Sequence, residues 1–490
     1  MRKLSKMVLL SAVVAPLFVM GCGDDEDSDN PGGGATSNEG GDGGTSGKNT
    51  GGTSTSGSGG KSGSGTGGTK ADAGEAPVGG GGSGNGPTTC DIDALEDGGA
   101  IPVDGDGDIS EDTTLESGKS YTFDGQLRVL DGVTLTVEPC VKIMGESPDA
   151  VLGVMQGAKI EAAGTADAPI VFTSSKAAGA RKPGDWGGII IMGNAQVNQP
   201  NPQVEGLVAA TPYGSATADN NDESSGTLQY VRIEFVGREI MKDVESNGIT
   251  FAGVGSGTVV DHIQVSNSID DCFEWFGGTV NATHLVALNC DDDMFDTDFG
   301  FTGTVQYAFG RAFPESAEAD SNGFEMDTAN NANIDPLTTA QWSNVTLCGP
   351  NTGTVPTENP RIGMVLRRQV SGAISNAIVT GFDSGAFSIR NTDLVPPTDI
   401  ALTSSAIFGN ESVYHSTNAA GDTWFEDQEG NETLEEAPAG FDCYANPPAP
   451  IPDEDLPGEA AAGFEAAEYK GAFKAGENWM TGAWISWDEE

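Results

Sequence analysis

A repeat of 22 residues near the middle of the chain constrains its fold more than any other feature. The first copy, VDHIQVSNSIDDCFEWFGG, begins at Val260, and the second, NATHLVALNCDDDMFDTDFG, begins at Asn281. Shorter matches are FEMD at Phe324 and FSIR at Phe387. The copies are short runs of β-forming residues between Gly and Asn, without helical periodicity. Such a repeat predicts a solenoid in which each copy forms one coil of strands.

Stacked coils place equivalent side chains in columns about 4.8 Å apart, and side chains alternate between inside and outside along each strand. If the Phe column of the repeats points inward, the residues that follow it point outward. The predicted outward positions are a first column of Glu274, Asp296 and Glu325, a second column of Asp298 and Asp327 with Arg390 further along, and adjoining turns with Asp270, Asp271, Asp292 and Asp293.

Carboxylates at this spacing repel each other, by about 1 kcal/mol per pair in water and by several at lower dielectric. Either water solvates the acidic columns or a cation offsets the repulsion. Ca²⁺ binds about six to eight oxygen atoms, which carboxylates of adjacent coils can supply. The sequence leaves the solvated surface and the metal site both open. The candidate Ca²⁺ ligands are Asp270, Asp271, Glu274, Asp292, Asp293, Asp296, Asp298, Glu325 and Asp327.

Catalysis is the alternative to binding. A polysaccharide lyase of the pectate type needs a basic residue as proton acceptor beside Ca²⁺, and the candidates are Arg311, Arg367, Arg368 and Arg390. A glycoside hydrolase needs two carboxyl groups about 5.5 Å or about 6.5–9.5 Å apart, which stacked acidic residues can meet by accident. Neither pattern is specific, so we favour binding, and Trp275 and Phe276 would offer a stacking surface for sugars if exposed.

Two further pairs fall on equivalent positions of the repeat. His262 aligns with His284, so their rings are predicted to stack one coil apart. Histidine pairs bind transition metals, but hydrogen-bonded surface residues are the favoured interpretation here. Asn267 aligns with Asn289, which predicts an asparagine ladder at a turn.

The formal net charge of -50 limits the classes of partner. Nucleic acid and anionic membrane surfaces are disfavoured, because phosphate binding needs Lys and Arg. Cations and neutral glycans stay open, and we expect a monomer.

Seven cysteines occur, without a CxxC spacing that would indicate zinc or redox chemistry. In an oxidising compartment the six after Cys22 can form three disulfides. Many pairings are possible, and we predict Cys90–Cys140, Cys272–Cys290 and Cys348–Cys443.

The N-terminus has the pattern of a secretion signal. Arg2, Lys3 and Lys6 precede an apolar run that is too short to span a bilayer. It ends in VMGC, which resembles a bacterial lipobox with Cys22 as the acylated residue; an ordinary signal peptide with a chance cysteine is the alternative. Residues 22–89 are almost entirely Gly, Ser, Thr and Asp, which predicts a disordered tether.

The predicted organisation is a signal peptide in residues 1–21, the tether in 22–89, an all-β parallel solenoid in 90–440 and a C-terminal cap segment in 441–490. Residues 200–225 are predicted to form a loop that projects from the coils. The tail carries Trp479, Trp484 and Trp487, which we expect to cover the last coil and its exposed backbone edge. An aromatic platform for sugars is the alternative.

Several stretches resemble a poorly characterised family of bacterial surface proteins. They are SGTLQYVRIEFVG, GDWGGIIIMG, LTVEPC and, most specifically, the DDCFEWFGGTV and DDDMFDTDFG segments. The resemblance runs from about Asp108 to the C-terminus. It implies a right-handed parallel β-helix with the architecture of pectate lyases and an outer-surface location, but no established reaction. Many members end in a sorting domain, and the acyl anchor at Cys22 would replace it here.

Together these features predict a lipid-anchored outer-membrane protein, exposed at the cell surface or facing the periplasm. Its expected role is non-catalytic binding of Ca²⁺, extracellular polysaccharide or both, with a Ca²⁺-dependent lyase or a hydrolase as the alternative.

Overall fold

Strands form nearly all of the regular structure in the computed structural model. The structure describes residues 90–487, apart from 208, 242–243, 314–320, 329–333, 356–359, 391–399 and 416–422. The predicted signal peptide, the acylation site at Cys22 and the tether lie outside the described residues. Among the described residues, no helix has the length and apolarity needed to cross a bilayer.

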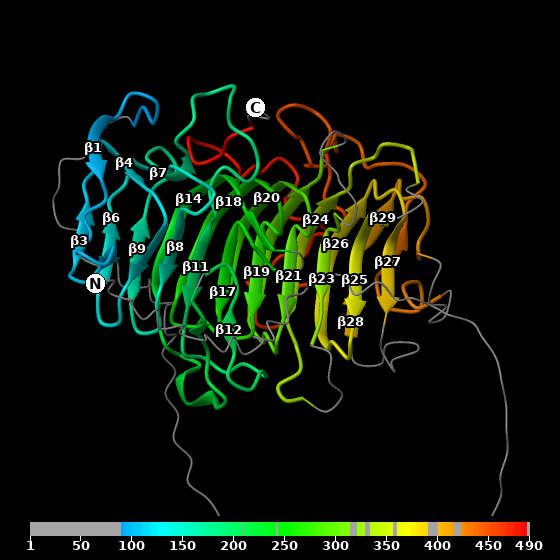
Figure 1. The fold of residues 1–490 in the computed structure, drawn as a ribbon. Helices are drawn as coiled ribbons and strands as arrows, with labels where there is room; N and C mark the ends of the chain where they lie inside the picture. The colour runs from blue at the N-terminus through cyan, green and yellow to red at the C-terminus, as the bar shows by residue number, and fades with distance from the viewer. Residues whose placement is uncertain are drawn as a thin grey trace, which may run out of the picture. The chain divides into compact units, whose positions relative to one another are not determined.

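Two stacks of parallel strands run the length of the solenoid (Figure 1). The larger, 16-stranded sheet contains β1 (Glu96–Ala100), β3 (Thr113–Leu115), β4 (Lys119–Phe123), β6 (Thr134–Val137), β7 (Val141–Gly145), β9 (Lys159–Ala163), β10 (Ile170–Ser174), β14 (Gly226–Val236), β18 (Val259–Ser268), β20 (Asn281–Cys290), β22 (Thr304–Arg311), β24 (Gln341–Cys348), β26 (Gly372–Thr380), β28 (Ile400–Thr403), β29 (Ala406–Phe408) and β30 (Glu432–Thr433).

The smaller, 10-stranded sheet contains β2 (Asp108–Ile109), β5 (Gln126–Val129), β8 (Val151–Val154), β11 (Ile189–Met192), β17 (Ile249–Ala252), β19 (Phe273–Phe276), β21 (Phe295–Asp298), β23 (Phe324–Met326), β25 (Ile362–Arg367) and β27 (Gly385–Arg390). Two antiparallel hairpins, β12 (Gln203–Val204) with β13 (Thr211–Pro212) and β15 (Arg238–Met241) with β16 (Val244–Ser246), and the 3₁₀ turn η1 (Ala218–Asn220) lie in connections between coils.

The larger sheet is bent because its long strands contain residues in the left-handed region, and β14, β18 and β20 contain two each. Tyr230, His262, His284 and Tyr307 have φ between 51° and 62° at the bend. Each is skipped in the parallel register, so that Asp261 pairs with Thr283 and the next pair is two residues further on. In the early coils the two arms are separate strands: β9 and β10 both pair with β14. Each coil is therefore three-sided, with two arms in the larger sheet.

The interior is a continuous apolar core with an aromatic column. Phe273 stacks on Phe295 with ring centroids 5.4 Å apart, and Trp275 and Trp342 close the same layer. This architecture confirms the predicted right-handed parallel β-helix. The three predicted disulfides, Cys90–Cys140, Cys272–Cys290 and Cys348–Cys443, are also confirmed.

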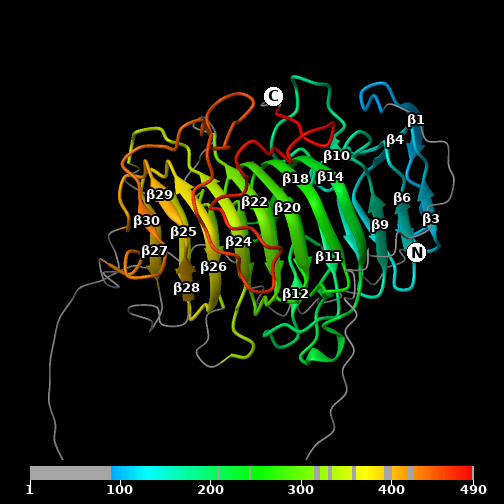
Figure 2. The ribbon, with the colours of Figure 1, turned by 180° about the vertical axis from the view of Figure 1, so that it is seen from behind.

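The tail after residue 440 runs along the outer face of the larger sheet, seen in red over β20, β22 and β24 in Figure 2. Side-chain amides of successive coils hold its backbone. Gln306 and Glu465 exchange two hydrogen bonds of 2.9 Å, and Gln264 and Ser486 exchange two of 2.7 and 2.8 Å. The tail therefore covers a side of the coils, whereas a cap over the open edge of the last coil was expected.

The prediction of a projecting loop at residues 200–225 is wrong for its apolar part. Val204 and Tyr213 are buried and pack with Ile190, Met192 and Phe276 on the outer face of the smaller sheet. The loop packs against an apolar patch on the outer face of the smaller sheet. It therefore lies next to the acidic residues of that sheet, which are described below.

Candidate functional site

The predicted acidic columns exist in the predicted register. Glu274 pairs with Asp296, and Asp296 pairs with Glu325, along β19, β21 and β23. Asp298 lies beside Phe276 in the second column. The Phe side chains before them belong to the interior core, so the acidic side chains point outward from the smaller sheet. We call the nine predicted acidic residues the acidic face.

The acidic face is buried, although it points outward. Glu274 and Asp296 are each 2% exposed and Asp298 is 1% exposed. Asp292 alone among the nine is partly exposed. Connections between coils approach these residues, since Glu205 and Glu245 both interact with Asp270. The solvated-surface alternative is therefore wrong for these residues, and repulsion between them is not screened by bulk water.

The structure brings most of the candidate ligands together in overlapping groups of three. Within each group, one oxygen atom from each residue lies within 4.8 Å of the others. The groups are Asp270, Asp271 and Asp292; Asp271, Glu274 and Asp296; and Asp293, Asp296 and Glu325. Shared members link all three groups into one cluster.

Part of this cluster has a structural role. Asp271 Oδ1 accepts a hydrogen bond of 2.8 Å from the backbone N–H of Asp293 in the next coil. Asp293 Oδ1 accepts one of 3.2 Å from Asn322 N–H, and Asn322 Oδ1 accepts one of 3.0 Å from Ile362 N–H. These side chains satisfy turn N–H groups that would otherwise be buried without an acceptor.

Glu274 and Asp296 differ, because each has a buried oxygen without a donor. Glu274 Oε2 accepts a hydrogen bond from Asn247 Nδ2, but Glu274 Oε1 has no partner among the described residues. Asp296 Oδ1 likewise has none there, and neither does Asn247 Oδ1. Burying such groups without a partner is costly, so these three oxygens mark where a ligand would be stabilised.

Burial and mutual repulsion raise the pKa values of these carboxyl groups. Burial, followed by the charge of Glu245, raises the pKa of Asp270 to about 8. Burial raises the pKa of Glu274 well above its usual value, and the charge of Asp296 adds to this. The pKa of Asp296 is raised well above its usual value by burial and then by Glu325. A protonated carboxyl is one way to relieve the repulsion, and a bound cation is the other.

Two acidic residues at this site were missed by the sequence analysis. Glu205, between β12 and β13, has a pKa raised well above its usual value by burial and then by Asp270 and Glu245. Glu245 lies on β16. Both come from connections outside the 22-residue repeat, so the repeat carried no signal for them.

Two of the four predicted arginines adjoin the acidic face. Arg367 forms ion pairs with Glu325 and, at 3.0 Å, with Asp327. Arg368 pairs with the same Asp327 side chain. Both guanidinium groups are buried against carboxylates.

For the other two arginines, Arg311 and Arg390, the structure gives no contact with the acidic face among the described side chains. Arg311 lies on β22 of the larger sheet, where its Nη1 donates to Ala445 O at 3.3 Å and its guanidinium lies 4.3 Å from the Phe313 ring centroid. Arg390 pairs with Arg367 in the backbone register of β27, and its side chain lies outside the described residues.

The aromatic platform predicted at Trp275 and Phe276 is wrong. Trp275 is fully buried in the interior, and Phe276 is 3% exposed beneath Tyr213. The Asn267–Asn289 ladder is confirmed, because Asn289 Nδ2 donates to Asn267 Oδ1 at 2.7 Å. The stacking of His262 and His284 is also confirmed, with ring centroids 4.1 Å apart.

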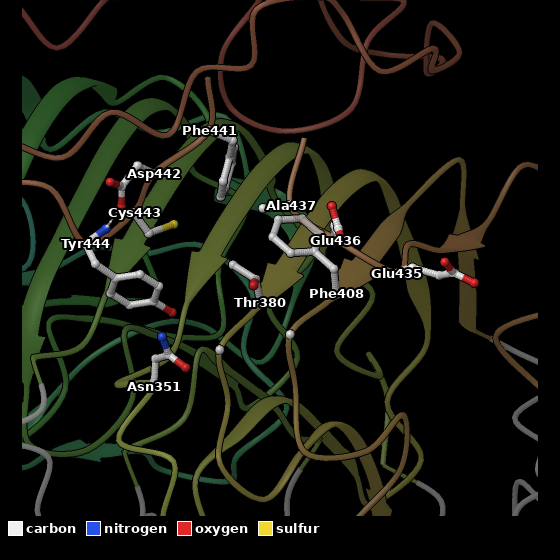
Figure 3. Close-up of a pocket in the computed structure, with 12 residues that line it drawn as sticks. Asn351, Thr380, Phe408, Glu435, Glu436, Ala437, Phe441, Asp442, Cys443 and Tyr444 are labelled. Carbon is white, nitrogen blue, oxygen red and sulfur yellow. Dashed lines mark hydrogen bonds between the residues drawn. The ribbon is translucent and has the colours of Figure 1, made fainter. Parts of the chain in front are cut away.

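A separate pocket lies at the outer face of the larger sheet, where the tail begins. Its volume is about 310 Å³. Figure 3 shows the rings of Phe408, Phe441 and Tyr444 around Thr380, with Asn351 below them. None of the described residues that line it is basic. The pocket therefore combines aromatic walls and hydroxyl and amide groups with the carboxylates of Glu435, Glu436 and Asp442, and it disfavours anions.

Comparison with known families identifies the fold. Residues 107–437 match the family described as the pectate-lyase like beta helix domain. The chain belongs to this family. The pectate-lyase-like β-helix is also similar to a solved catalytic domain of a GH87 alpha-1,3-glucanase variant in complex with tetrasaccharides, with 9% sequence identity and a TM-score of 0.26. That match covers 69% of this chain and 70% of the other, and it says nothing about activity. No curated protein matches the chain.

Proposed function

We propose that this β-helix is a lipid-anchored outer-membrane protein, acylated at Cys22, whose acidic face binds Ca²⁺. The observation that carries the proposal is the pair of buried carboxylates, Glu274 and Asp296, each with an oxygen that has no donor among the described residues. The donors around them are hard oxygen atoms, which suit Ca²⁺ better than transition metals. The backbone contacts of Asp271 and Asp293 would hold two further carboxylates in place.

Calorimetric titration of the full chain with Ca²⁺ tests this proposal. We expect saturable binding and a higher melting temperature in Ca²⁺ than in chelator, because a ligand that binds only the folded state stabilises it. The double variant Asp293→Asn with Asp296→Asn should lose the calorimetric signal. The matched control is Glu435→Gln with Glu436→Gln, which changes two exposed carboxylates at the other pocket and should bind as the wild type does. Equal binding by the Asp293 and Asp296 variant would reject the site.

A neutral extracellular glycan is the second ligand that we propose, and the pocket at Phe441 supports it. Aromatic rings bind the apolar faces of sugar rings, while hydroxyl and amide groups bind their hydroxyls. A panel of neutral oligosaccharides, followed by NMR or calorimetry, is the test. We expect at least one to bind the wild type, and Phe441→Leu to weaken that binding about tenfold or more. No binding by any neutral oligosaccharide would reject this part.

Catalysis is less well supported than binding. The carboxyl groups of the acidic face lie close together through the stacking of the coils, and such stacking can meet a glycosidase spacing by accident. A lyase needs an uncharged base, whereas Arg367 and Arg368 are both paired with carboxylates. Ca²⁺-dependent release of unsaturated products from a uronic-acid polymer would establish the lyase alternative.

A further inference from the structure

The bend of the larger sheet carries a second group of metal-binding side chains, on a different side of the coil from the acidic face. His262 and His284 project from left-handed positions of β18 and β20, and their rings stack between those of Tyr230 and Tyr307. The two histidines are equivalent in successive coils. The register of the sheet therefore presents two imidazoles side by side.

Asp261 lies between the two imidazoles. Its Oδ1 atom is 2.8 Å from Nδ1 of His284 and 2.8 Å from Nδ1 of His262. Thr283 Oγ1 donates to the same Oδ1 at 2.7 Å, and Gln229 Nε2 donates to Oδ2 at 3.1 Å. One hydroxyl donor and one amide donor thus fix the orientation of the Asp261 carboxylate.

One nitrogen in this group makes no well-directed hydrogen bond to a described residue. His284 Nδ1 makes a hydrogen bond to Asp261, but His262 Nδ1 is buried and makes none to any described residue, despite its short distance to Oδ1. A buried ring nitrogen without a partner is unfavourable. Among the buried polar atoms of Asp261, His262 and His284, Nδ1 of His262 is therefore the one without a hydrogen bond to a described residue.

A metal ion would satisfy that nitrogen. Zn²⁺ binds histidine nitrogen and carboxylate oxygen at about 2.0–2.2 Å, so two atoms bound to one tetrahedral ion lie about 3.4 Å apart. The Asp261–histidine distances of 2.8 Å are shorter than this value, so the side chains must move apart by about half an ångström to admit the ion. The rings, with centroids 4.1 Å apart, need a tilt to bring both Nδ1 atoms onto one ion. The side chains are 14–23% exposed, which leaves access for water as the fourth ligand.

We propose that Asp261, His262 and His284 bind one Zn²⁺ ion through the carboxylate and the two Nδ1 atoms. Thr283 and Gln229 orient the carboxylate, as groups outside the ligand shell commonly do. Two nitrogens and one oxygen favour Zn²⁺ or Cu²⁺ over Ca²⁺, whereas the acidic face offers oxygen alone. The two sites are chemically distinct, and this proposal does not depend on the proposed function.

Zinc titration of the full chain in excess Ca²⁺ tests the proposal, because Ca²⁺ occupies oxygen sites without competing for imidazole. We expect one zinc ion per chain under these conditions. The chain has three histidines, so the ¹⁵N resonances of their rings can be followed individually in the wild type. Zinc should shift the Nδ1 resonances of His262 and His284 and leave His415 unchanged. Shifts in neither ring would overturn the proposal without the need for any variant.

Substitutions give a second measurement. His262→Gln, His284→Gln and Asp261→Asn should each weaken calcium-resistant zinc binding by more than tenfold, and His415→Ala is the matched control that should not. Melting temperatures without zinc identify any variant that does not fold. Trp479 lies 5.1 Å from the His284 ring and Trp484 lies 5.2 Å from the His262 ring, so Cu²⁺ at this site should quench their fluorescence. Wild-type zinc affinity in a folded His262→Gln and His284→Gln double variant would mean that the group is only a structural hydrogen-bonded anchor.

Discussion

At the scale of the residue, the acidic face consists of carboxyl groups that differ in their hydrogen-bond partners. Asp271 and Asp293 each satisfy a backbone N–H of the next coil, whereas Asp296 accepts no hydrogen bond from a described residue. The sequence could show that these residues align, because alignment follows from the repeat. It could not show which carboxylate lacks a donor, because donors come from turns and connections whose geometry the repeat does not encode.

The buried carboxyl groups without donors predict how the free energy of unfolding changes with pH when no metal is present. The pKa of Asp270 rises from 3.8 to about 8 on folding, and those of Glu274 and Asp296 also rise. The folded state then binds more protons than the unfolded state between about pH 4 and pH 8, so the free energy of unfolding falls as pH rises through that window. Urea unfolding in chelator at pH 5 and pH 8 measures this, and we expect lower stability at pH 8.

The matched variant is Asp296→Asn, which removes one buried charge while keeping the shape of the side chain. In chelator it should stabilise the protein at pH 8 by roughly 1–4 kcal/mol and change stability much less at pH 4, where the carboxyl is protonated in the folded state and about half protonated in the unfolded state. A variant that is less stable than the wild type at pH 8 in chelator would show that Asp296 has a partner that the described residues do not supply.

At the scale of the element, each coil does more than provide a strand. Gln264 on β18, Gln306 on β22 and Asn376 on β26 hold the backbone of the tail with paired hydrogen bonds. Apolar contacts also attach the tail to the larger sheet, since Phe309 packs on Phe473 with ring centroids 5.8 Å apart. The tail has almost no secondary structure of its own, so these contacts determine its path.

Removal of two of these amides should release the tail. The double variant Gln264→Ala with Gln306→Ala loses four hydrogen bonds to the tail backbone, each worth about 1 kcal/mol. Limited proteolysis should then cut within residues 457–480 about tenfold faster or more, because local opening exposes the backbone. Gln203→Ala, on an exposed hairpin residue, is the control. An unchanged cleavage rate would mean that apolar packing alone holds the tail.

At the scale of the whole molecule, the β-helix and the acidic register were predictable, because both follow from the spacing of the repeat, whereas the repeat contains only two of the six paired cysteines and did not determine the disulfides. The Cys272–Cys290 pair joins the ends of neighbouring coils. The burial of the acidic face was not predictable. It depends on connections between coils, such as the one with Glu205, which lies 65 positions upstream of Asp270 and interacts with it. Local periodicity contains no information about which face of a solenoid a connection covers.

The path of the tail also limits how this protein can change in length. A solenoid built from equal units can grow by duplicating one, since a new coil finds the same neighbours above and below. Here the tail contacts β26, β24, β22 and β18 through fixed lengths of intervening chain. One extra coil between β18 and β26 would move these amides away from their partners. The contacts of the tail are therefore compatible with only the present number of coils between β18 and β26.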